Sequence, residues 1–155
     1  MPPDTRSYLQ TLRCDAQLEQ LWDALVRPEA LRLWHAEAAQ VEPVAGGVYR
    51  YRSRLLGLRE ARIDACEPGR RLRLVYRPNP AWPPQGAEAI VEDFLIDLRP
   101  IGAGREQAQL RLIGSGVPAE AAWDAAFRRL QAGWAVAFSH LQRRLERNEL
   151  DRRAS

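Results

Sequence analysis

The longest regular pattern of hydrophobic and polar positions lies near the C-terminus and predicts an amphipathic helix. Large apolar residues recur there at steps of three and four, which places them on one helix face: Trp123, Phe127, Leu130, Trp134, Phe138, Leu141 and Leu145. From Pro118 to about Arg147 such a helix is roughly 45 Å long. A buried face of this length requires a wide apolar surface on which to pack.

The chain before this helix alternates between apolar and polar residues, which predicts strands that are buried on one face. From Arg71 onward the alternation is clean, with Leu72, Leu74 and Tyr76 on one side and arginines on the other. Turn residues separate the predicted strands, which are 7–13, 48–53, 58–66, 71–77, 90–98 and 107–113. In the last two strands the residues expected to point inward are Ile90, Phe94, Ile96, Leu98, Leu110 and Leu112.

Two short helices are predicted between the first strand and the rest of the sheet. Asp15 is placed to cap the first helix, whose apolar face consists of Leu18, Leu21, Trp22 and Leu25. Pro28 follows that helix and is suited to start a second one, because proline is favoured at a first helical position. Leu31 and Trp34 point inward from the second helix.

The predicted order is therefore one strand, two short helices, six strands and one long C-terminal helix, an α+β arrangement with a curved antiparallel sheet wrapped around the long helix. Five of the six strands after the short helices are assigned to the residue ranges given above. Residues 1–155 are expected to form a single domain with its core at about 7–147 and loose tails at 1–6 and 148–155. The proline-rich segment 78–87 is predicted to be a loop, either a plain exposed turn or a cover over a site.

Four motifs, in this order, carry a resemblance to a known family. The first is Leu-Trp-Asp-Ala-Leu at 21–25, followed by Pro28-Glu29 and Trp34. The others are Gly-Gly-Val-Tyr-Arg-Tyr at 46–51, Glu-Pro-Gly-Arg-Arg-Leu at 67–72, and Gly133-Trp134 followed by Leu141 and Leu145. Together they resemble the SRPBCC (START-like, Bet v 1-like) superfamily. Within it they are similar to the branch related to the activator of heat-shock protein 90 ATPase (Aha-type C-terminal domains).

The resemblance implies a helix-grip (Bet v 1-like) fold, in which the sheet wraps the long helix and leaves a cavity between them. It does not imply one activity, because the superfamily includes lipid and hormone carriers as well as aromatase/cyclases. Two positions depart from the branch's pattern. Gly114 stands where the branch usually has a histidine, and Gly104-Arg105-Glu106 replaces its usual turn before the last strand.

Composition excludes several classes of protein. With 46% hydrophobic and 28% charged residues the chain is neither disordered nor a membrane-spanning protein. Its first residues lack the basic and apolar regions of a secretory signal, and Cys14 and Cys66 have no ligand or disulfide spacing, so a cytoplasmic location is expected. Phosphate loops, dinucleotide fingerprints and zinc motifs are also missing. No catalytic residue, cofactor or metal is therefore assigned.

The net charge of +3 is concentrated in one region. All 23 basic residues are arginine, and residues 48–77 hold nine of them against three acids. Alternation places five of these on the outer sheet face: Arg50, Arg52, Arg71, Arg73 and Arg77. Such a surface is either a solvated face or a site for an acidic protein partner. A nucleic acid is a weaker hypothesis, because no aromatic residue lies between these arginines.

The candidate ligand-binding residues are those expected to face the cavity. The apolar and aromatic candidates are Trp34, Tyr49, Tyr51, Tyr76, Phe94, Trp134 and Phe138. Glu92 shares the inward face of its strand with Phe94. Three alternatives stay open: Glu92 is turned outward by a bulge or lies at the solvated end of its strand, it pairs with an inward arginine such as Arg62 or Arg52, or it contacts a polar ligand group or acts as an acid/base. His35 follows Trp34 near the expected cavity entrance and is either a surface histidine or a hydrogen-bond partner for a ligand.

Three functional hypotheses follow. The first is a small-molecule-binding protein that holds an apolar, aromatic or lipid-like ligand between the sheet and the C-terminal helix, without a cofactor. The second, which the resemblance suggests, is a chaperone-associated or regulatory interaction module that uses the arginine-rich outer face. The third is an aromatase/cyclase-like or hydrolase-like enzyme in which Glu92 or His35 transfers protons. The protein is expected to be a monomer or a homodimer.

Overall fold

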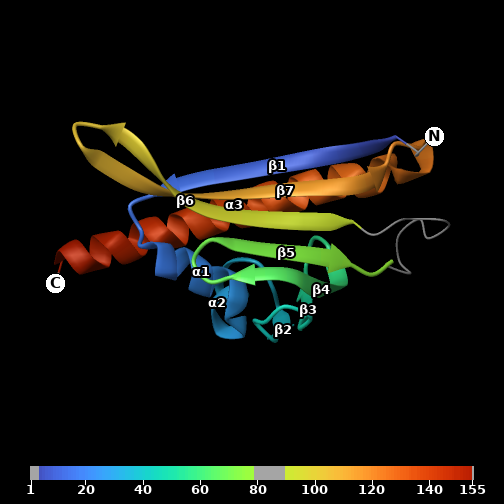
Figure 1. Cartoon of the computed structure of the whole chain (residues 1–155), viewed down its shortest axis with the longest axis horizontal. Coiled ribbons are helices and arrows are strands. Elements are labelled where there is room, and N and C mark those ends of the chain that lie inside the picture. Colours follow the sequence, from blue (N-terminus) through green and yellow to red (C-terminus); the bar gives the residue numbers. More distant parts are fainter. Residues whose placement is uncertain (1–3, 79–89, 155) are drawn as a thin grey trace.

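A single antiparallel sheet is the framework of the protein (Figure 1). The computed structural model describes residues 4–78 and 90–154, with side chains as far as Arg147, so that most of the predicted loop 78–87 lies outside the described residues. Within those ranges seven strands pair in the order β1-β7-β6-β5-β4-β3-β2. They are β1 (Thr5–Cys14), β2 (Ala38–Val41), β3 (Val48–Ser53), β4 (Gly57–Glu67), β5 (Arg71–Tyr76), β6 (Val91–Gly102) and β7 (Arg105–Pro118).

The two short helices lie where the sequence pattern places them, but the long helix begins later and ends later than predicted. Pro118 still belongs to a strand, and the helix continues to Ala154 through residues expected to form a loose tail, while Thr5 and Arg6 of the other expected tail belong to the first strand. Helix α1 (Leu18–Val26) and helix α2 (Pro28–Trp34) connect β1 to β2, and a 3-10 turn, η1 (Ala121–Trp123), precedes the long helix α3 (Asp124–Ala154). In Figure 1 α3 passes behind the sheet and alongside β1 and β7. The element order and the curved sheet around one long helix confirm the predicted α+β helix-grip fold. Within the described ranges, no helix combines the length and the apolar composition that a membrane crossing requires.

The cap of α1 and the strand β2 also differ from the sequence predictions. Asp15 does not cap α1: the N-cap is Gln17, whose N–H donates to the Gln20 side chain at 3.0 Å, while Asp15 accepts a hydrogen bond from Gln107. The short strand β2 received no residues in the sequence prediction. Its four residues are too few for alternation to show, and the strand exists because it pairs with β3.

Alternation along the strands places the core on the side of the sheet that faces α3. Leu72, Leu74 and Tyr76 are buried as predicted, and so are Ile90, Phe94, Ile96, Leu110 and Leu112. Leu98 is the exception, with 49% of its surface exposed. The end of β6 projects beyond the core in the hairpin with β7 (Figure 1). A side chain there that points to the inner side of the sheet is therefore not covered by other residues.

The buried face of α3 matches the predicted stripe, with Phe127 only partly buried and the other six residues buried. Gly133 marks the closest approach of the helix to the turn between β3 and β4. A Cβ atom there would lie 2.7 Å from the Leu56 Cδ2 atom, so only glycine lets the two elements meet at this distance. The helix is therefore held by the sheet along one side and by this turn at its middle.

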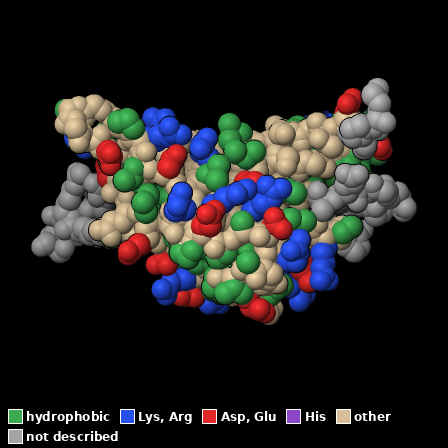
Figure 2. Space-filling model, viewed as in Figure 1, with side chains coloured by type: hydrophobic (Ala, Val, Ile, Leu, Met, Phe, Trp, Pro, Cys, Tyr) green, Lys and Arg blue, Asp and Glu red, His purple; other side chains and the backbone are tan. Residues whose placement is uncertain are grey.

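The outer sheet face carries acidic as well as basic side chains and is not the purely arginine-rich surface that the sequence suggested. Arg71 and Arg73 each bind Asp93 of the neighbouring strand, at 3.1 and 3.0 Å, and Arg73 also lies 3.3 Å from Asp64. Arg77 lies 3.7 Å from Glu60. Figure 2 shows arginines and acidic residues interspersed over this face. Counting only the charges of residues 48–77 overstates the positive charge of this face, because Asp93, which pairs with Arg71 and Arg73, lies on β6 outside that range.

Candidate functional site: a buried polar cluster inside the grip

Glu92 lies at the centre of the inner sheet face and is completely buried, with 0% of its surface exposed. It belongs to β6, where it pairs across the sheet with Leu74 of β5 and Gly114 of β7. Its Oε2 atom accepts three hydrogen bonds: from the Tyr8 hydroxyl, from Trp134 Nε1 at 2.7 Å and from an Arg59 guanidinium nitrogen at 3.0 Å. The Glu92 side chain thus points to the inner face, as the alternation of its strand predicts, and it is not turned outward by a bulge.

The ion-pair partner of Glu92 is Arg59, which corrects the expectation of Arg62 or Arg52. Arg59 is 3% exposed and points inward from β4 with the same parity as Ala61 and Ile63. Arg62 has the opposite parity and lies 3.5 Å from Asp64 on the outer face. The alternation of β4 already contained this answer, since Arg59 shares its face with two apolar residues.

Arg59 is held by aromatic residues as well as by the carboxylate. It donates to the Tyr51 hydroxyl at 2.8 Å, and its guanidinium carbon lies 3.7 Å from the centre of the Tyr76 ring. The Tyr51 and Tyr76 hydroxyls are 3.2 Å apart. A planar cation stacked on an aromatic ring and bonded to a carboxylate is a favourable arrangement for a buried arginine.

Tyr8 is a member of the cluster that the sequence analysis missed. Tyr8, Gly114 and Glu92 form one row across β1, β7 and β6, with Gly114 in the middle. A Cβ atom at position 114 would fall within the Tyr8 ring, so the glycine lets the ring cross β7 and bring its hydroxyl to Glu92. The departure of Gly114 from the family pattern was the available signal.

All the tyrosines of this region are neutral phenols. Burial raises the pKa of Tyr51 to about 12, and it raises the pKa values of Tyr8 and Tyr76 well above 10.0. The pKa of Tyr49 is also well above 10.0, mainly because of burial. Tyr49 has a separate role, however: its hydroxyl donates to the Leu25 carbonyl at 2.6 Å and fastens β3 to the end of α1.

His35 ends α2 and packs its ring against the cluster. The ring stacks on Trp134 with 4.3 Å between centres and lies 4.6 Å from the Tyr51 ring. Burial, and secondarily the charge of Arg59, lowers the pKa of His35 from 6.5 to about 3, so the imidazole is neutral at physiological pH. His35 is therefore packed against two aromatic rings and is not the freely solvated surface histidine that was one of the two expectations.

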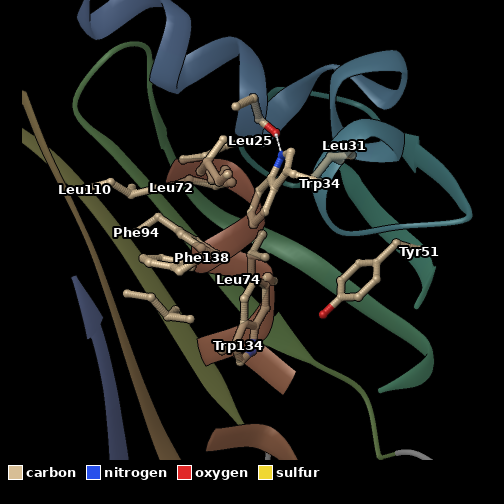
Figure 3. Close-up of a cluster of buried hydrophobic side chains, with 14 of the residues drawn as sticks. Leu25, Leu31, Trp34, Tyr51, Leu72, Leu74, Phe94, Leu110, Trp134 and Phe138 are labelled. Carbon is tan, nitrogen blue, oxygen red and sulfur yellow. Dashed lines mark hydrogen bonds between the residues drawn. The ribbon is translucent and has the colours of Figure 1, made fainter. Parts of the chain in front are cut away.

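The remaining candidates form an aromatic layer beside the polar cluster (Figure 3). Trp134 packs edge-on against Phe94 and Phe138, at 5.6 and 6.2 Å between ring centres. Trp34 lies 6.3 Å from Phe138, and its indole nitrogen donates to the Ala24 carbonyl at 2.9 Å. Trp134 thus joins the aromatic layer to the carboxylate.

Two polar atoms in this region have no hydrogen-bond partner among the described residues, Glu92 Oε1 and His35 Nε2. Both are buried, and leaving such an atom unpaired costs on the order of 1–3 kcal/mol. Native proteins satisfy nearly all buried polar groups, so these two atoms call for a partner such as water, a ligand or a protein donor that shifts towards them. For Glu92 the Tyr76 hydroxyl is such a donor, since hydrogen bonding to Glu92 contributes to the raised pKa of Tyr76. Across the same described parts of the chain, no group of histidine, cysteine and carboxylate side chains has an arrangement that would hold a metal ion.

Comparison with known families places this site in context. The model of the family described as Activator of Hsp90 ATPase homolog 1-like protein matches residues 15–146. The chain belongs to this family. Membership confirms the resemblance drawn from the sequence motifs. Among the curated proteins, none matches this Aha1-like chain significantly.

Solved structures confirm the fold of the Aha1-like chain. A protein of Mesorhizobium loti is 22% identical, with a TM-score of 0.72, and the match covers 92% of this chain and 98% of that one. The solution structure of the Aha1 dimer from Colwellia psychrerythraea is 18% identical, with a TM-score of 0.73 and coverages of 91% and 96%. DynU16, from the dynemicin biosynthetic locus, is 18% identical with a TM-score of 0.68, and the match covers 90% of this chain and 47% of that one.

Proposed function

We propose that this Aha1-like protein binds a small apolar or aromatic molecule between the sheet and α3 and recognises one polar group of that molecule through Glu92. The observation that carries the proposal is the pair of buried, unpartnered atoms, Glu92 Oε1 and His35 Nε2, beside an aromatic layer. A hydrogen-bond donor on the ligand would satisfy Oε1.

Each residue of the cluster has a distinct part in this proposal. Tyr8, Trp134 and Arg59 fix Oε2 and so orient the carboxylate, leaving Oε1 for the ligand. The neutral imidazole of His35 can accept a hydrogen bond at Nε2. Trp134 and Phe94 supply apolar contact, which contributes about 25 cal/mol for each Å² removed from water.

A pair of probes that differ by one hydroxyl tests this proposal. 2-Naphthol carries an aromatic body and an O–H donor, whereas naphthalene has only the aromatic body. We expect 2-naphthol to raise the melting temperature more than naphthalene does, and native mass spectrometry to show one bound molecule. If neither probe binds, or if naphthalene binds as well as 2-naphthol, Glu92 does not recognise a ligand donor.

The same experiment with two variants separates recognition from folding. Glu92→Gln should remove most of the difference between the probes, because a charged acceptor makes a stronger hydrogen bond than an amide. Tyr8→Phe removes one donor from Oε2 and leaves Oε1 unchanged, so this variant should still prefer 2-naphthol. A preference lost equally in both variants would indicate general disturbance of the core.

A second candidate function is capture of a protein partner, as the family description and the dimeric Colwellia relative suggest. The outer face would provide the surface, with Arg71 and Arg73 at its centre. Their pairing with Asp93 leaves less free positive charge than the sequence indicated, so this candidate has weaker support. Charge reversal at both arginines should abolish capture of an acidic partner or change the oligomeric state in sedimentation; unchanged behaviour would reject it.

A further inference from the structure

A groove runs along α3 on the side that faces α2 and the turn between β3 and β4. It consists of two pockets that share His140. The first has a volume of about 250 Å³, and its walls include Trp34, Leu55, Val136 and Ala137. The second has a volume of about 210 Å³ and is lined by Leu33, His140, Arg143, Arg144 and Arg147. The groove is therefore apolar at one end and basic at the other.

One stripe of the helix produces this change. Gly133, Ala137, His140, Arg144 and Arg147 follow one another at steps of three and four, so they lie on the same side of α3. Small and apolar residues occupy its first part and basic residues its second. From position 136 to position 147 the helix axis advances about 16 Å, which matches an elongated molecule with two chemically different ends.

The groove exposes more hydrophobic surface than a solvated helix face requires. Leu33, Leu55 and Val136 border the two pockets with 56%, 45% and 42% of their surfaces exposed. These three residues come from α2, the β3–β4 turn and α3, so the patch forms only in the folded protein. Concave apolar surface assembled in this way is typical of a binding groove.

The arginines at the basic end have no acidic partner among the described side chains. Arg143 makes only a long bond of 3.4 Å to the Ser139 carbonyl, and neither pocket is lined by an aspartate or glutamate. On the outer sheet face, in contrast, Arg71 and Arg73 are matched by Asp93. At the apolar end, Arg54 lies 3.4 Å from Glu37. Among the described side chains, the arginines of the groove that have no acidic partner are thus confined to one end.

We infer that this groove binds an amphipathic anion, with its apolar chain over Val136 and Ala137 and its carboxylate or phosphate between Arg144 and Arg147. Arginine suits either anion, because its planar guanidinium donates two parallel hydrogen bonds. The site is separate from the buried cluster of Glu92 and goes beyond the proposed function. Trp34 and His35 border both sites, since each ring contacts Trp134 and each residue also lines the apolar pocket.

Titration calorimetry with three ten-carbon probes below their micelle concentrations tests this inference. Decanoate and decyl phosphate carry the anion, and decanol carries only the chain. We expect both anions to bind more tightly than decanol, and the anions to bind less tightly as salt increases. The stronger of the two anions identifies the headgroup. If no anion binds, or if decanol binds equally well, the inference is wrong.

Charge reversal locates the site. The double variant Arg144→Glu/Arg147→Glu should weaken decanoate binding at least tenfold and leave decanol binding unchanged. The control variant reverses the charge of two exposed arginines outside the groove, Arg105→Glu/Arg128→Glu, and its decanoate affinity should stay within twofold of the wild type. The groove variant should not alter 2-naphthol binding, so that failure at the groove and failure at the buried cluster are recognised separately. Equal losses in the groove and control variants would overturn the inference.

Discussion

Tyr8 reaches Glu92 by crossing over Gly114, and the missing side chain at position 114 is what makes this contact possible. The three residues lie in one row on adjacent strands. Three donors from different elements therefore orient the carboxylate: Tyr8 of the edge strand β1, Arg59 of β4 and Trp134 of α3. Among the described residues, this arrangement leaves Glu92 Oε1 without a hydrogen-bond partner.

Gly114→Ala should destabilise the protein by about 1–3 kcal/mol, because the added methyl group forces the Tyr8 ring to move. Chemical denaturation measures the change. In a Tyr8→Ala background the same substitution should cost much less, since the ring is no longer there. Additive effects of the two substitutions would contradict the contact.

Glu92→Gln should destabilise the fold by about 3–5 kcal/mol, because it leaves the buried charge of Arg59 without its carboxylate. Asp93→Asn is the matched control on the outer face of the same strand. Its ion pairs are partly exposed and should contribute about 1 kcal/mol or less each. Equal losses of unfolding free energy in the two variants would mean that Glu92 is not in a dry interior.

The four tyrosines of the chain should resist ionisation together. Their raised pKa values mean that the folded state favours the neutral phenols, so this contribution is fully present below pH 10 and is lost as the pH rises through the folded-state values. Phenolate absorbance should stay low at pH 10 and then appear in one step with alkaline unfolding. Gradual ionisation near pH 10 would show that the hydroxyls are solvated.

His35 should make the protein less stable in mild acid. Its pKa in the folded state is about 3, below the ordinary value of 6.5, so the unfolded chain binds the proton more readily. This stability is fully present above pH 6.5 and is lost as the pH falls towards 3. Because carboxylates also titrate in part of this range, the test compares the wild type with His35→Phe. The difference in stability should change between pH 6.5 and 4; a constant difference would contradict it.

The fold was predictable because its signals are periodic and local. The stripe of α3 and the alternation around Leu72 and Leu74 identify the buried faces without any knowledge of the partner elements. The motif order around Trp34 and Gly133-Trp134 then identifies the family. The predicted cap at Asp15 and the predicted burial of Leu98 were wrong for the opposite reason. A helix cap and a hairpin that projects from the core both depend on where neighbouring segments end.

The site was predictable only in part, because its contacts cross the sheet. Alternation placed Glu92 inside but could not choose its partner, and parity along β4 would have favoured Arg59 over Arg62. Tyr8 lies two strands away from Glu92, and its contact depends on Gly114 of the intervening β7. No local sequence pattern links these three residues. The unpartnered Oε1 is a property of the assembled interior alone.

The central claim is that the free oxygen of Glu92 recognises a donor group on a ligand held under α3. Titration calorimetry of 2-naphthol against the wild type and Glu92→Gln measures this directly. A hydrogen bond to a charged group contributes about 1.5–3 kcal/mol and one to a neutral amide about 0.5–1.5 kcal/mol, so the variant should bind roughly five- to tenfold more weakly. Equal dissociation constants for the two proteins, each shown to be folded, would contradict the account.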